Sequence, residues 1–259
     1  MAQYLKSQSI IPQFVAHRGF SVRYPENTLL AIEQALLAGA CYVECDVQLT
    51  LDGVPVLLHD DSLQRTCGVS ANITELRWAE LNNISAHYAE RFGQQYGQVS
   101  IPSLSQLLAL MQNWPGRCVF AEIKRASIRK FGEDRVFNAL INALDSASEQ
   151  VIVISFDLKI MQHISKETAL PVGWVIEEWT DDNLALAQQL APAYLFVDHE
   201  RIPRNLTALP DTNWRWVLYE IDDAATARGW VEKGAHYIET NDIGNMLLVP
   251  EFAKSRCDG

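Results

Sequence analysis

Two basic side chains stand next to each other where a short apolar run ends, in the stretch VAHRGFSVRYPENT. His17 and Arg18 directly follow Phe14–Ala16. An imidazole titrates near pH ~6.5 and can move protons near neutrality. A guanidinium offers paired donors to a phosphate or a carboxylate. Because His-Arg pairs also occur on solvated surfaces, this pair alone does not define a site.

Three carboxylates lie on strand-like segments further along the chain. Glu44 and Asp46 are two residues apart and therefore share one face of a strand, whereas Cys45 points to the opposite face. Glu122 lies near the end of another strand-like segment. Oxygen donors without a His/Cys cluster suit a hard divalent cation, Mg²⁺ or Ca²⁺. Solvated rim carboxylates, or carboxylates paired with Arg18 and Lys124, are the alternative.

A predicted hairpin returns a second histidine to these carboxylates. Only the six residues QLTLDG separate Val47 from Val54, whereas a parallel crossover needs about a dozen or more. Asp52-Gly53 is a strong hairpin turn signal. If the turn centres on this dipeptide, paired residue numbers sum to about 105 and His59 lies opposite Asp46. A slip of one residue would turn His59 to the other face.

Together these groups predict a site for a phosphodiester anion. Three carboxylates with one divalent cation carry a net charge of −1, and Arg18 and Lys124 bring it to about +1. Arginine offers bidentate donors to phosphate and lysine a point charge. Of the two imidazoles, at His17 and His59, one can take the proton of an attacking hydroxyl and the other can protonate the departing alkoxide. A cation would lower the pKa of the attacking oxygen.

The elements that must position these groups form a repeating pattern. Strand-length apolar runs are predicted at nine places, and segments of helical periodicity separate most of them: Phe14–Ala16, Tyr42–Val47, Val54–Leu58, Cys118–Ile123, Val151–Phe156, Val172–Ile176, Tyr194–Val197, Arg215–Ile221 and Tyr237–Thr240. Without the antiparallel arm at Val54–Leu58, eight parallel strands remain. The pattern predicts an α/β (β/α)8 TIM barrel with a hairpin arm after its second strand. A doubly wound open sheet is the alternative.

A long polar excursion follows the arm. Residues 60–102 contain short helical pieces such as TELRWAELNNI and are predicted to form a small insert at the rim. We expect residues 1–259 to form a single phosphodiesterase barrel domain. Periodic helices are predicted over 29–40, 103–114, 134–147, 158–169, 182–191 and 225–235. The basic run Arg125–Lys130 is predicted to be a solvated loop.

Composition excludes several classes of protein. The 259 residues are 48% hydrophobic and carry a formal net charge of −11, which argues against a nucleic-acid or anionic-membrane partner bound by charge. No apolar run approaches the ~18 residues that span a bilayer, and the first residues lack the apolar core of a signal peptide. The five cysteines show no C-x-x-C spacing. They are expected to be reduced thiols in a cytoplasmic protein; a homodimer is left open.

Several short motifs, in order, resemble the glycerophosphodiester phosphodiesterase family, relatives of phosphatidylinositol-specific phospholipase C. They extend from Ala16 to Phe156: AHRG, PENT, the E-x-D of VECDVQLTLDG, VPVLLHD, Leu63-x-Arg65-Thr66, IPSL before a helix, EIK and SF. Each motif is weak alone, but the ordered set is specific. The resemblance implies a (β/α)8 barrel with a small insert after the second histidine.

The resemblance also implies a role for each matching residue. His17 and His59 would be the acid/base pair, Arg18 and Lys124 would hold the phosphate, and the metal ligands would be Glu44, Asp46 and Glu122. Further residues are expected to line the site, orient its ligands or contact substrate: Glu26, Asn27, Phe156 and Tyr219.

The implied reaction is metal-dependent hydrolysis of glycerophosphodiesters, such as glycerophosphocholine or glycerophosphoethanolamine, to sn-glycerol 3-phosphate and an alcohol. Attack by the glycerol 2-hydroxyl through a cyclic phosphate and direct attack by water both stay open. The competing hypotheses are a lysophospholipase D-like or other phosphodiesterase activity, and a non-catalytic barrel that binds metal or phosphate.

The C-terminal half departs from the family pattern. Where the family usually reads W-T-V-N, this chain has Tyr219-Glu220-Ile221-Asp222, and where it usually reads T-D it has Thr240-Asn241. Tyr219 retains an aromatic side chain where an indole usually packs on substrate. Glu220 adds a carboxylate if it points inward. These departures bear on substrate preference more than on the chemistry.

Overall fold

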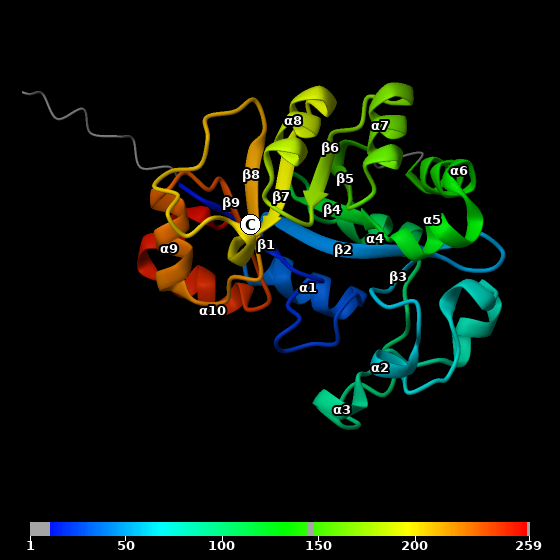
Figure 1. Ribbon diagram of the computed structural model, residues 1–259. Helices are drawn as coiled ribbons and strands as arrows, with labels where there is room; N and C mark the ends of the chain where they lie inside the picture. Colours follow the sequence, from blue (N-terminus) through cyan, green and yellow to red (C-terminus); the bar gives the residue numbers. More distant parts are fainter. Residues whose placement is uncertain (1–10, 145–147, 258–259) are drawn as a thin grey trace, which may run out of the picture.

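The computed structural model describes residues 11–144 and 148–257, and its centre is a closed barrel (Figure 1). Strand β1 pairs in parallel with both β2 and β9, which closes the sheet and excludes the open-sheet alternative. The parallel barrel strands are β1 (Gln13–Ala16), β2 (Tyr42–Leu49), β4 (Cys118–Ile123), β5 (Val151–Ser155), β6 (Val172–Ile176), β7 (Tyr194–Asp198), β8 (Arg215–Tyr219) and β9 (Tyr237–Thr240). The predicted TIM barrel is confirmed.

Helices cover the outside of the barrel. The predicted helices are present as α1 (Leu29–Leu37), α4 (Leu104–Met111), α6 (Glu133–Leu144), α7 (Leu158–Glu167), α8 (Asp181–Leu190) and α9 (Ala224–Glu232). The last residues of the helix predicted over 134–147 lie outside the described part of the chain. None of the helices in the described ranges has the length and apolar character needed to cross a bilayer.

Some helices were not predicted. The basic run after β4 is helix α5 (Arg125–Phe131), not a loop, and α10 (Ile243–Leu248) follows β9. Helix α5 forms because it is anchored: the buried Ser127 hydroxyl accepts a hydrogen bond from Leu49 N at 2.8 Å. The remaining short elements are α2 (Gln64–Cys67), α3 (Ala89–Phe92), η1 (Ile73–Glu75), η2 (Trp78–Asn83), η3 (Ser148–Gln150), η4 (His199–Arg201) and η5 (Pro250–Ser255).

Apolar side chains fill the inside of the barrel. Phe120 on β4 is fully buried and lies 5.2 Å from the Phe196 ring and 5.8 Å from the Tyr42 ring, measured between centroids. Val15, Ile152 and other inward residues belong to the same cluster. Because the interior is packed, polar side chains of the strands gather at the carboxyl-terminal rim, where barrels of this type have their active sites.

The hairpin arm is antiparallel, as predicted, but its register differs by one residue. Strand β3 (Pro55–Leu57) pairs with β2 so that Val47 faces Leu57, and Leu58 N donates to Asp46 O at 3.0 Å. The prediction that His59 lies opposite Asp46 is therefore wrong. The turn has three residues, with Gly53 at φ +85° and Thr50 bonded to Val54 O, a common alternative to the two-residue turn.

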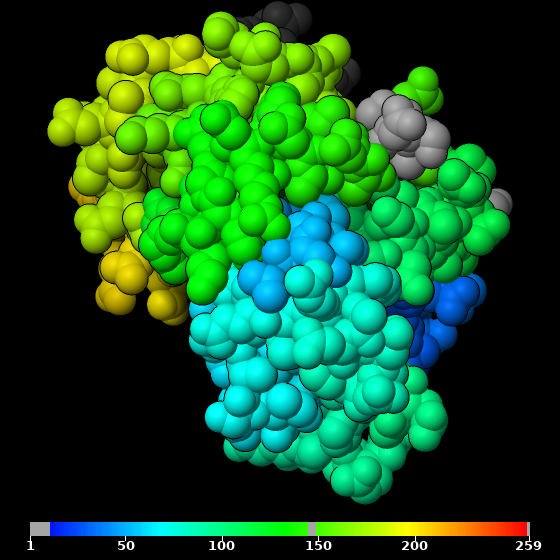
Figure 2. Space-filling model, turned by 90° about the vertical axis from the view of Figure 1, so that its right-hand side faces the viewer, coloured from blue at the N-terminus to red at the C-terminus, as the bar shows by residue number. Residues whose placement is uncertain are grey.

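The insert stands out from the barrel and has an apolar cluster of its own. In Figure 2 the cyan and teal residues project below the green and blue barrel. We call this second cluster the insert core; its buried members are Val56, Leu58, Leu63, Cys67, Ile73, Leu81, Ala86 and Ile101. Residues 60–102 thus contain the expected short helical pieces, packed around apolar side chains.

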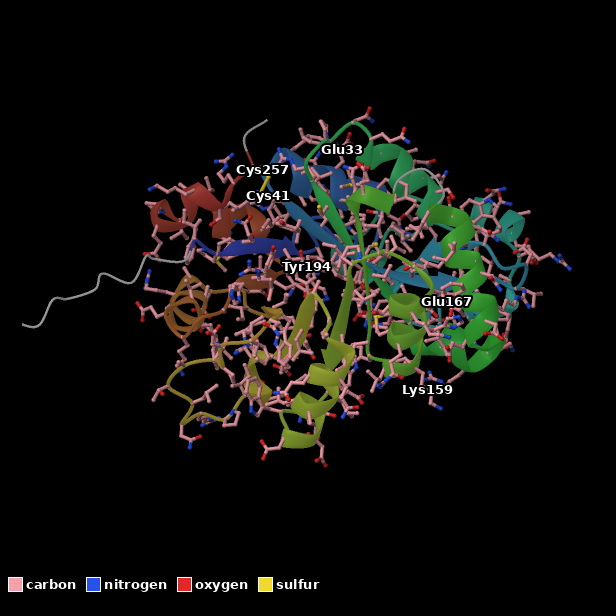
Figure 3. The ribbon with its side chains drawn as sticks, turned by 90° about the horizontal axis from the view of Figure 1, so that it is seen from above. Glu33, Cys41, Lys159, Glu167, Tyr194 and Cys257 are labelled. Carbon is pink, nitrogen blue, oxygen red and sulfur yellow. A yellow bond between two sulfur atoms is a disulfide. The ribbon has the colours of Figure 1, made fainter. Side chains whose placement is uncertain are left out.

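A disulfide joins the start of the second barrel strand to the segment after the last helical turn. Cys41, just before β2, is bonded to Cys257 across a sequence separation of 216 residues (Figure 3). The prediction of reduced thiols is wrong for this pair, because closure of the barrel brings the two cysteines together in space. Cys45, Cys67 and Cys118 are free, and Cys45 is buried in the core, as expected for packing.

Removing this disulfide should destabilise the fold. Cys257→Ser is expected to lower the free energy of unfolding by about 2–4 kcal/mol, because the bond restricts a long loop of the unfolded chain. Chemical denaturation with and without reductant measures the effect. Reductant should lower the stability of the wild-type protein to that of the variant and leave the variant unchanged; a wild-type protein insensitive to reductant would contradict the prediction.

Candidate active site

A pocket of about 110 Å³ opens at the carboxyl-terminal rim of the barrel. Each wall comes from the end of a different strand: His17 directly follows β1, Lys124 follows β4 and Tyr219 ends β8. Most of the residues predicted from the sequence line it: His17, Arg18, Glu44, His59, Glu122, Lys124, Phe156 and Tyr219. Glu220 also lines the pocket, although the residue as a whole is exposed.

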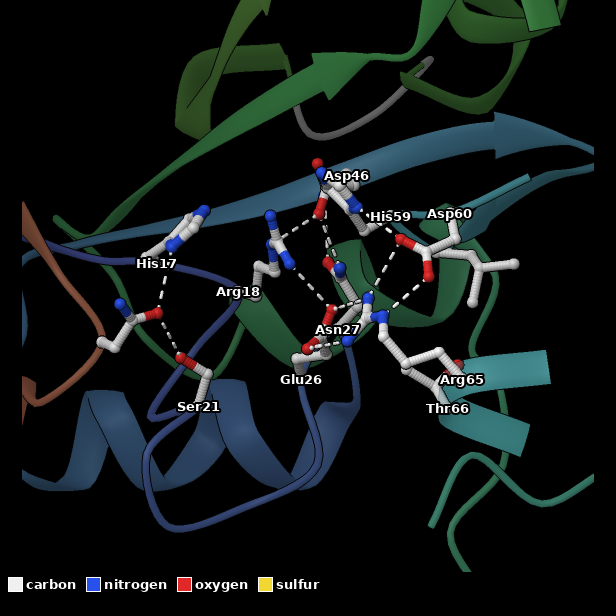
Figure 4. Close-up of polar contacts among 12 residues, drawn as sticks. His17, Arg18, Ser21, Glu26, Asn27, Asp46, His59, Asp60, Arg65 and Thr66 are labelled. Carbon is white, nitrogen blue, oxygen red and sulfur yellow. Dashed lines mark hydrogen bonds and ion pairs between the residues drawn. The ribbon is translucent and has the colours of Figure 1, made fainter. Parts of the chain in front are cut away.

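The remaining predicted residues, Glu26, Asn27 and Asp46, lie behind this wall and fix its side chains (Figure 4). Asn27 Nδ2 donates to Asp46 Oδ2 at 2.7 Å, and Asp46 N donates to Asn27 Oδ1 at 2.9 Å. Glu26 accepts from Arg18 Nη1 at 2.9 Å. Glu26 and Asn27 thus orient Arg18 and Asp46.

The local sequence explains why the HRG turn lies against the PENT turn. A Cβ atom on Gly19 would lie 2.5 Å from Ala31 C, so only glycine allows helix α1 to approach this closely. Thr28 caps α1 by accepting from Ala31 N at 3.1 Å. Arg18 has a left-handed φ of 55°, and its backbone N donates to Glu44 Oε2 at 3.0 Å. Strain of this kind is common at functional sites.

Basic side chains neutralise two of the predicted carboxylates. Lys124 Nζ lies 3.1 Å from Asp46 Oδ1 and 2.8 Å from Glu122 Oε1, and Arg18 Nε lies 3.1 Å from Asp46 Oδ2. Burial opposes ionisation of Asp46, but Lys124 and Arg18 outweigh burial and hold its pKa well below the usual range. Burial raises the pKa of Glu122 to about 7, although Lys124 opposes the shift.

Glu44 is the carboxylate without such compensation. Its side chain is 2% exposed, and in the part of the chain that the structure describes, Oε1 has no hydrogen-bond partner. Burial, followed by the charges of Asp46 and Glu239, raises its pKa well above the ordinary value. A buried carboxylate oxygen that is left unpaired is costly. A cation at this point would supply the missing partner.

The donor set fits a hard divalent cation. Glu44, Asp46 and Glu122 each offer one oxygen, and these oxygens all lie within 4.8 Å of one another. Oxygen ligands suit Mg²⁺ or Ca²⁺ better than the softer metals. The two alternatives from the sequence are therefore compatible: Asp46 and Glu122 are paired with Arg18 or Lys124, and the three carboxylates together also form a possible metal site.

A fourth buried carboxylate was not predicted from the sequence. Glu239 lies in β9, is 4% exposed, and has Oε1 3.6 Å from His17 Nε2. The signal was a lone charged residue inside the short strand Tyr237–Thr240. If Glu239 is ionised, the four carboxylates carry a charge of −4. One divalent cation, Arg18 and Lys124 together carry +4, so the site would have no net positive charge to attract a phosphate. Burial, and then the charge of Glu122, raises the pKa of Glu239 well above its ordinary value, which favours its neutral form.

His17 is held at the edge of this cluster. Its Nδ1 lies 3.0 Å from Asn241 Oδ1, and its Nε2 lies 4.0 Å from Glu44 Oε2. Burial, together with the adjacent Arg18 charge, lowers the pKa of His17 to about 4. The ring is therefore neutral near pH ~7, the form in which an imidazole accepts a proton.

His59 reaches the pocket although its predicted register is wrong. Strand β3 ends at Leu57, so the alternation of faces no longer applies two residues later. The buried Gln48 amide nitrogen donates to the carbonyls of Leu58 (3.2 Å), His59 (3.1 Å) and Asp60 (2.7 Å). This one side chain fixes the path of the backbone that carries His59.

A continuous series of hydrogen bonds and ion pairs then links His59 to Arg18, as the dashed lines in Figure 4 show. His59 Nδ1 lies 2.7 Å from Asp60 Oδ1, and Arg65 Nε donates to Asp60 Oδ2 at 2.7 Å. Arg65 also donates to both oxygens of Glu26, at 2.7 and 2.8 Å. The sequence motif Leu63-x-Arg65-Thr66 does not by itself indicate a role for Arg65, whereas the structure shows that Arg65 joins the insert to the barrel rim.

Gln48→Met should therefore affect both stability and activity. The substitution leaves three carbonyls without their donor and should lower the free energy of unfolding by about 1–3 kcal/mol. Displacement of His59 should lower kcat by about tenfold to a hundredfold. Denaturation curves and steady-state kinetics measure the two effects. Gln106→Met is the control, because Gln106 belongs to the capping box of α4; it should lower stability alone, and equal kcat losses in both variants would contradict the assignment.

Comparison with known proteins places these features in a family. A glycerophosphodiester phosphodiesterase of Bacillus altitudinis is 34% identical over 58% of this chain and 62% of its own. One from Caldanaerobacter subterraneus is 26% identical over 90% of this chain and 95% of its own. The chain thus spans about three fifths of the first relative, whereas its alignment with the second covers nearly all of both.

Solved structures show the same fold. A phosphodiesterase of Oleispira antarctica, in complex with the product sn-glycerol-3-phosphate, superposes with a TM-score of 0.82 at 24% identity, over 92% of this chain and 96% of that one. A Thermotoga maritima glycerophosphodiester phosphodiesterase gives a TM-score of 0.72 at 23% identity, over 91% and 97%. The model of the glycerophosphoryl diester phosphodiesterase family matches residues 17–245. The chain belongs to this family.

Proposed function

We propose that the protein is a metal-dependent phosphoric diester hydrolase. It would convert glycerophosphodiesters such as glycerophosphocholine and glycerophosphoethanolamine to sn-glycerol 3-phosphate and an alcohol. One observation carries the proposal: two imidazoles, two basic side chains and a cluster of buried carboxylates line or support one small pocket at the catalytic rim of the barrel. Family membership supports the same substrate class.

The pocket has groups of the right charge and shape for such a substrate. Arg18 and Lys124 line it and would hold the phosphate oxygens. Phe156 and Tyr219 also line it and would pack against the carbon atoms of the substrate. Glu44, Asp46 and Glu122 would hold Mg²⁺ or Ca²⁺. When bound, this cation would neutralise charge on the phosphate and lower the pKa of an attacking hydroxyl.

The two histidines would move the protons. His17, neutral and with Nε2 toward the pocket, would accept the proton of the attacking hydroxyl. His59, oriented through Nδ1 by Asp60, would donate a proton to the departing alkoxide. The same pair serves attack by the glycerol 2-hydroxyl through a cyclic phosphate and direct attack by water, and we leave both routes open.

The test is a coupled assay for sn-glycerol 3-phosphate over a panel of diesters, lysophospholipids and metals. We expect turnover of glycerophosphocholine or glycerophosphoethanolamine with Mg²⁺ or Ca²⁺. Turnover of lysophospholipids alone would favour the alternative of a lysophospholipase D-like activity. The large apolar side chains exposed in the described residues, such as Leu37 and Leu248, do not line the pocket, which favours a water-soluble diester. Metal binding without turnover of any diester would favour the alternative of a non-catalytic barrel that binds metal or phosphate.

The other expectations remain proposals of the same kind. We propose that residues 1–259 form one catalytic domain, with the insert at about 60–102 as part of it. The partner would be a small-molecule diester. Cytoplasmic localisation and a homodimer stay predictions.

A further inference from the structure

Two residues outside the pocket, Asp222 and Asn241, form a tightly bonded pair beside His17. Asp222 Oδ1 accepts from Asn241 N at 2.7 Å, and Asp222 Oδ2 accepts from Asn241 Nδ2 at 3.0 Å. Thr240 Oγ1 also donates to Asp222 Oδ1 at 2.9 Å. Although Asp222 is exposed, three donors from two adjacent residues converge on its carboxylate. The carboxylate therefore fixes both the backbone and the side chain of Asn241.

These hydrogen bonds to Asp222 determine which end of the Asn241 amide faces His17. A carboxylate accepts hydrogen bonds and does not donate them, so it selects the NH₂ end of the amide. The oxygen end is left to face His17 Nδ1 at 3.0 Å, and it also accepts from Ser21 Oγ at 3.0 Å. If the amide were reversed, its oxygen would face the Asp222 carboxylate and that contact would become repulsive, while its NH₂ end would face His17 Nδ1 and select the opposite tautomer.

The orientation of the amide in turn decides where His17 carries its hydrogen. An amide oxygen can only accept, so Nδ1 of the neutral ring must be the donor and Nε2 must hold the lone pair. Nε2 is the atom on the pocket side, 3.6 Å from Glu239 Oε1 and 4.0 Å from Glu44 Oε2. The opposite tautomer would place a hydrogen where a general base needs its lone pair.

We propose that Asp222 and Asn241 are positioning residues that hold His17 in the Nδ1–H tautomer. The inference rests on the proposed function in one respect, the role of His17 as the base; the tautomer itself follows from the contacts. It also accounts for a feature of the sequence. Two of the departures from the family pattern, Asp222 and Asn241, contact each other, so this pair of positions still holds one carboxylate and one amide.

The first test removes the selecting carboxylate while it leaves Asn241 in place. In Asp222→Asn the facing amide offers both a donor and an acceptor, so either orientation of Asn241 is bonded. The ¹⁵N shifts of the His17 ring in histidine-labelled, Mg²⁺-loaded protein distinguish the two tautomers. We expect only Nδ1–H in the wild type and a mixture in the variant. With a glycerophosphodiester substrate, kcat should fall about tenfold while KM stays within about threefold.

The second test exchanges the pair. In Asp222→Asn/Asn241→Asp, residue 241 presents two acceptor oxygens, so either orientation again selects Nδ1–H. We expect a single tautomer and recovery of most of kcat. Thr240→Val is the matched control: it removes a hydrogen bond to the same carboxylate but leaves both contacts with Asn241, and should change neither readout.

The outcomes separate this inference from the proposed function. An Nδ1–H ring in Asp222→Asn with unchanged kcat would overturn the positioning role. If Asp222→Asn fails to fold, the double variant Asp222→Asn/Asn241→Asp provides the test. Loss of the Nδ1–H tautomer of His17 in that variant would also overturn the positioning role. The expected tautomers in a protein that hydrolyses no diester would support the positioning role and reject the proposed substrate class.

Discussion

His17→Gln should lower kcat by about 1,000-fold, within the range that a general base contributes. Glutamine keeps a polar side chain of similar reach but has no group that accepts a proton near neutrality. The partly buried ring lies between Asn241 and the pocket carboxylates Glu44 and Glu239. His59, the other imidazole of the pocket, is held by Asp60 and would serve the departing group. Steady-state release of sn-glycerol 3-phosphate measures the loss.

The same substitution at a distant histidine provides the control. His163 lies on α7, where its ring stacks on Phe137 at 4.3 Å and Nδ1 is 2.8 Å from Glu133 Oε1. His163→Gln should retain wild-type kcat. Activity of His17→Gln within about tenfold of the wild type would be incompatible with general-base catalysis at this position.

Removal of the divalent cation should have an effect of similar size. EDTA, or Glu44→Gln, should lower kcat by about 1,000-fold, because a metal supplies several kcal/mol and each ~1.4 kcal/mol is tenfold in rate. Calorimetric titration with Mg²⁺ or Ca²⁺ should show affinity at least about 100-fold weaker in Glu44→Gln. Among the proposed ligands, Glu44 is the informative one to change, because its Oε1 has no hydrogen-bond partner among the described residues.

Two results would refute this metal assignment. One is catalysis unaffected by EDTA; the other is metal affinity in Glu44→Gln equal to that of the wild type. Glu33→Gln, on the exposed face of α1, is the matched control and should bind metal and turn over substrate normally. Re-addition of Mg²⁺ or Ca²⁺ after EDTA should restore activity to the wild type but not to Glu44→Gln.

The barrel and most of its rim could be predicted because the signals were local and repeated. Each barrel strand is an apolar run long enough to recognise, and the spacing of Val47 and Val54 excluded a parallel crossover. Glu44 and Asp46 share a face by simple alternation. Arg18 and Lys124 directly follow strands, so the rule that barrel sites lie at strand ends placed them correctly.

What could not be predicted depended on turn chemistry and on long-range contacts. The Asp52-Gly53 signal fits a two-residue turn and a three-residue turn equally, and the choice moved the register of His59 by one residue. The bond between Cys41 and Cys257 joins residues 216 positions apart, which no local pattern reveals. The basic run of α5 resembled a loop because its anchor, Leu49 N, belongs to a different element.

The placement of His59 divides the proposed catalytic groups between two apolar clusters. His17, Glu44 and Lys124 are carried by the barrel, whereas His59 and Arg65 are carried by a segment whose packing is the insert core. Regions of one protein can open independently, with their own free energies. Opening of the insert would remove one proton carrier and leave the barrel folded. Substitutions in the insert core would therefore change the fraction of molecules that hold His59 in the pocket. On heating, activity would be lost at a lower temperature than the fold of the barrel.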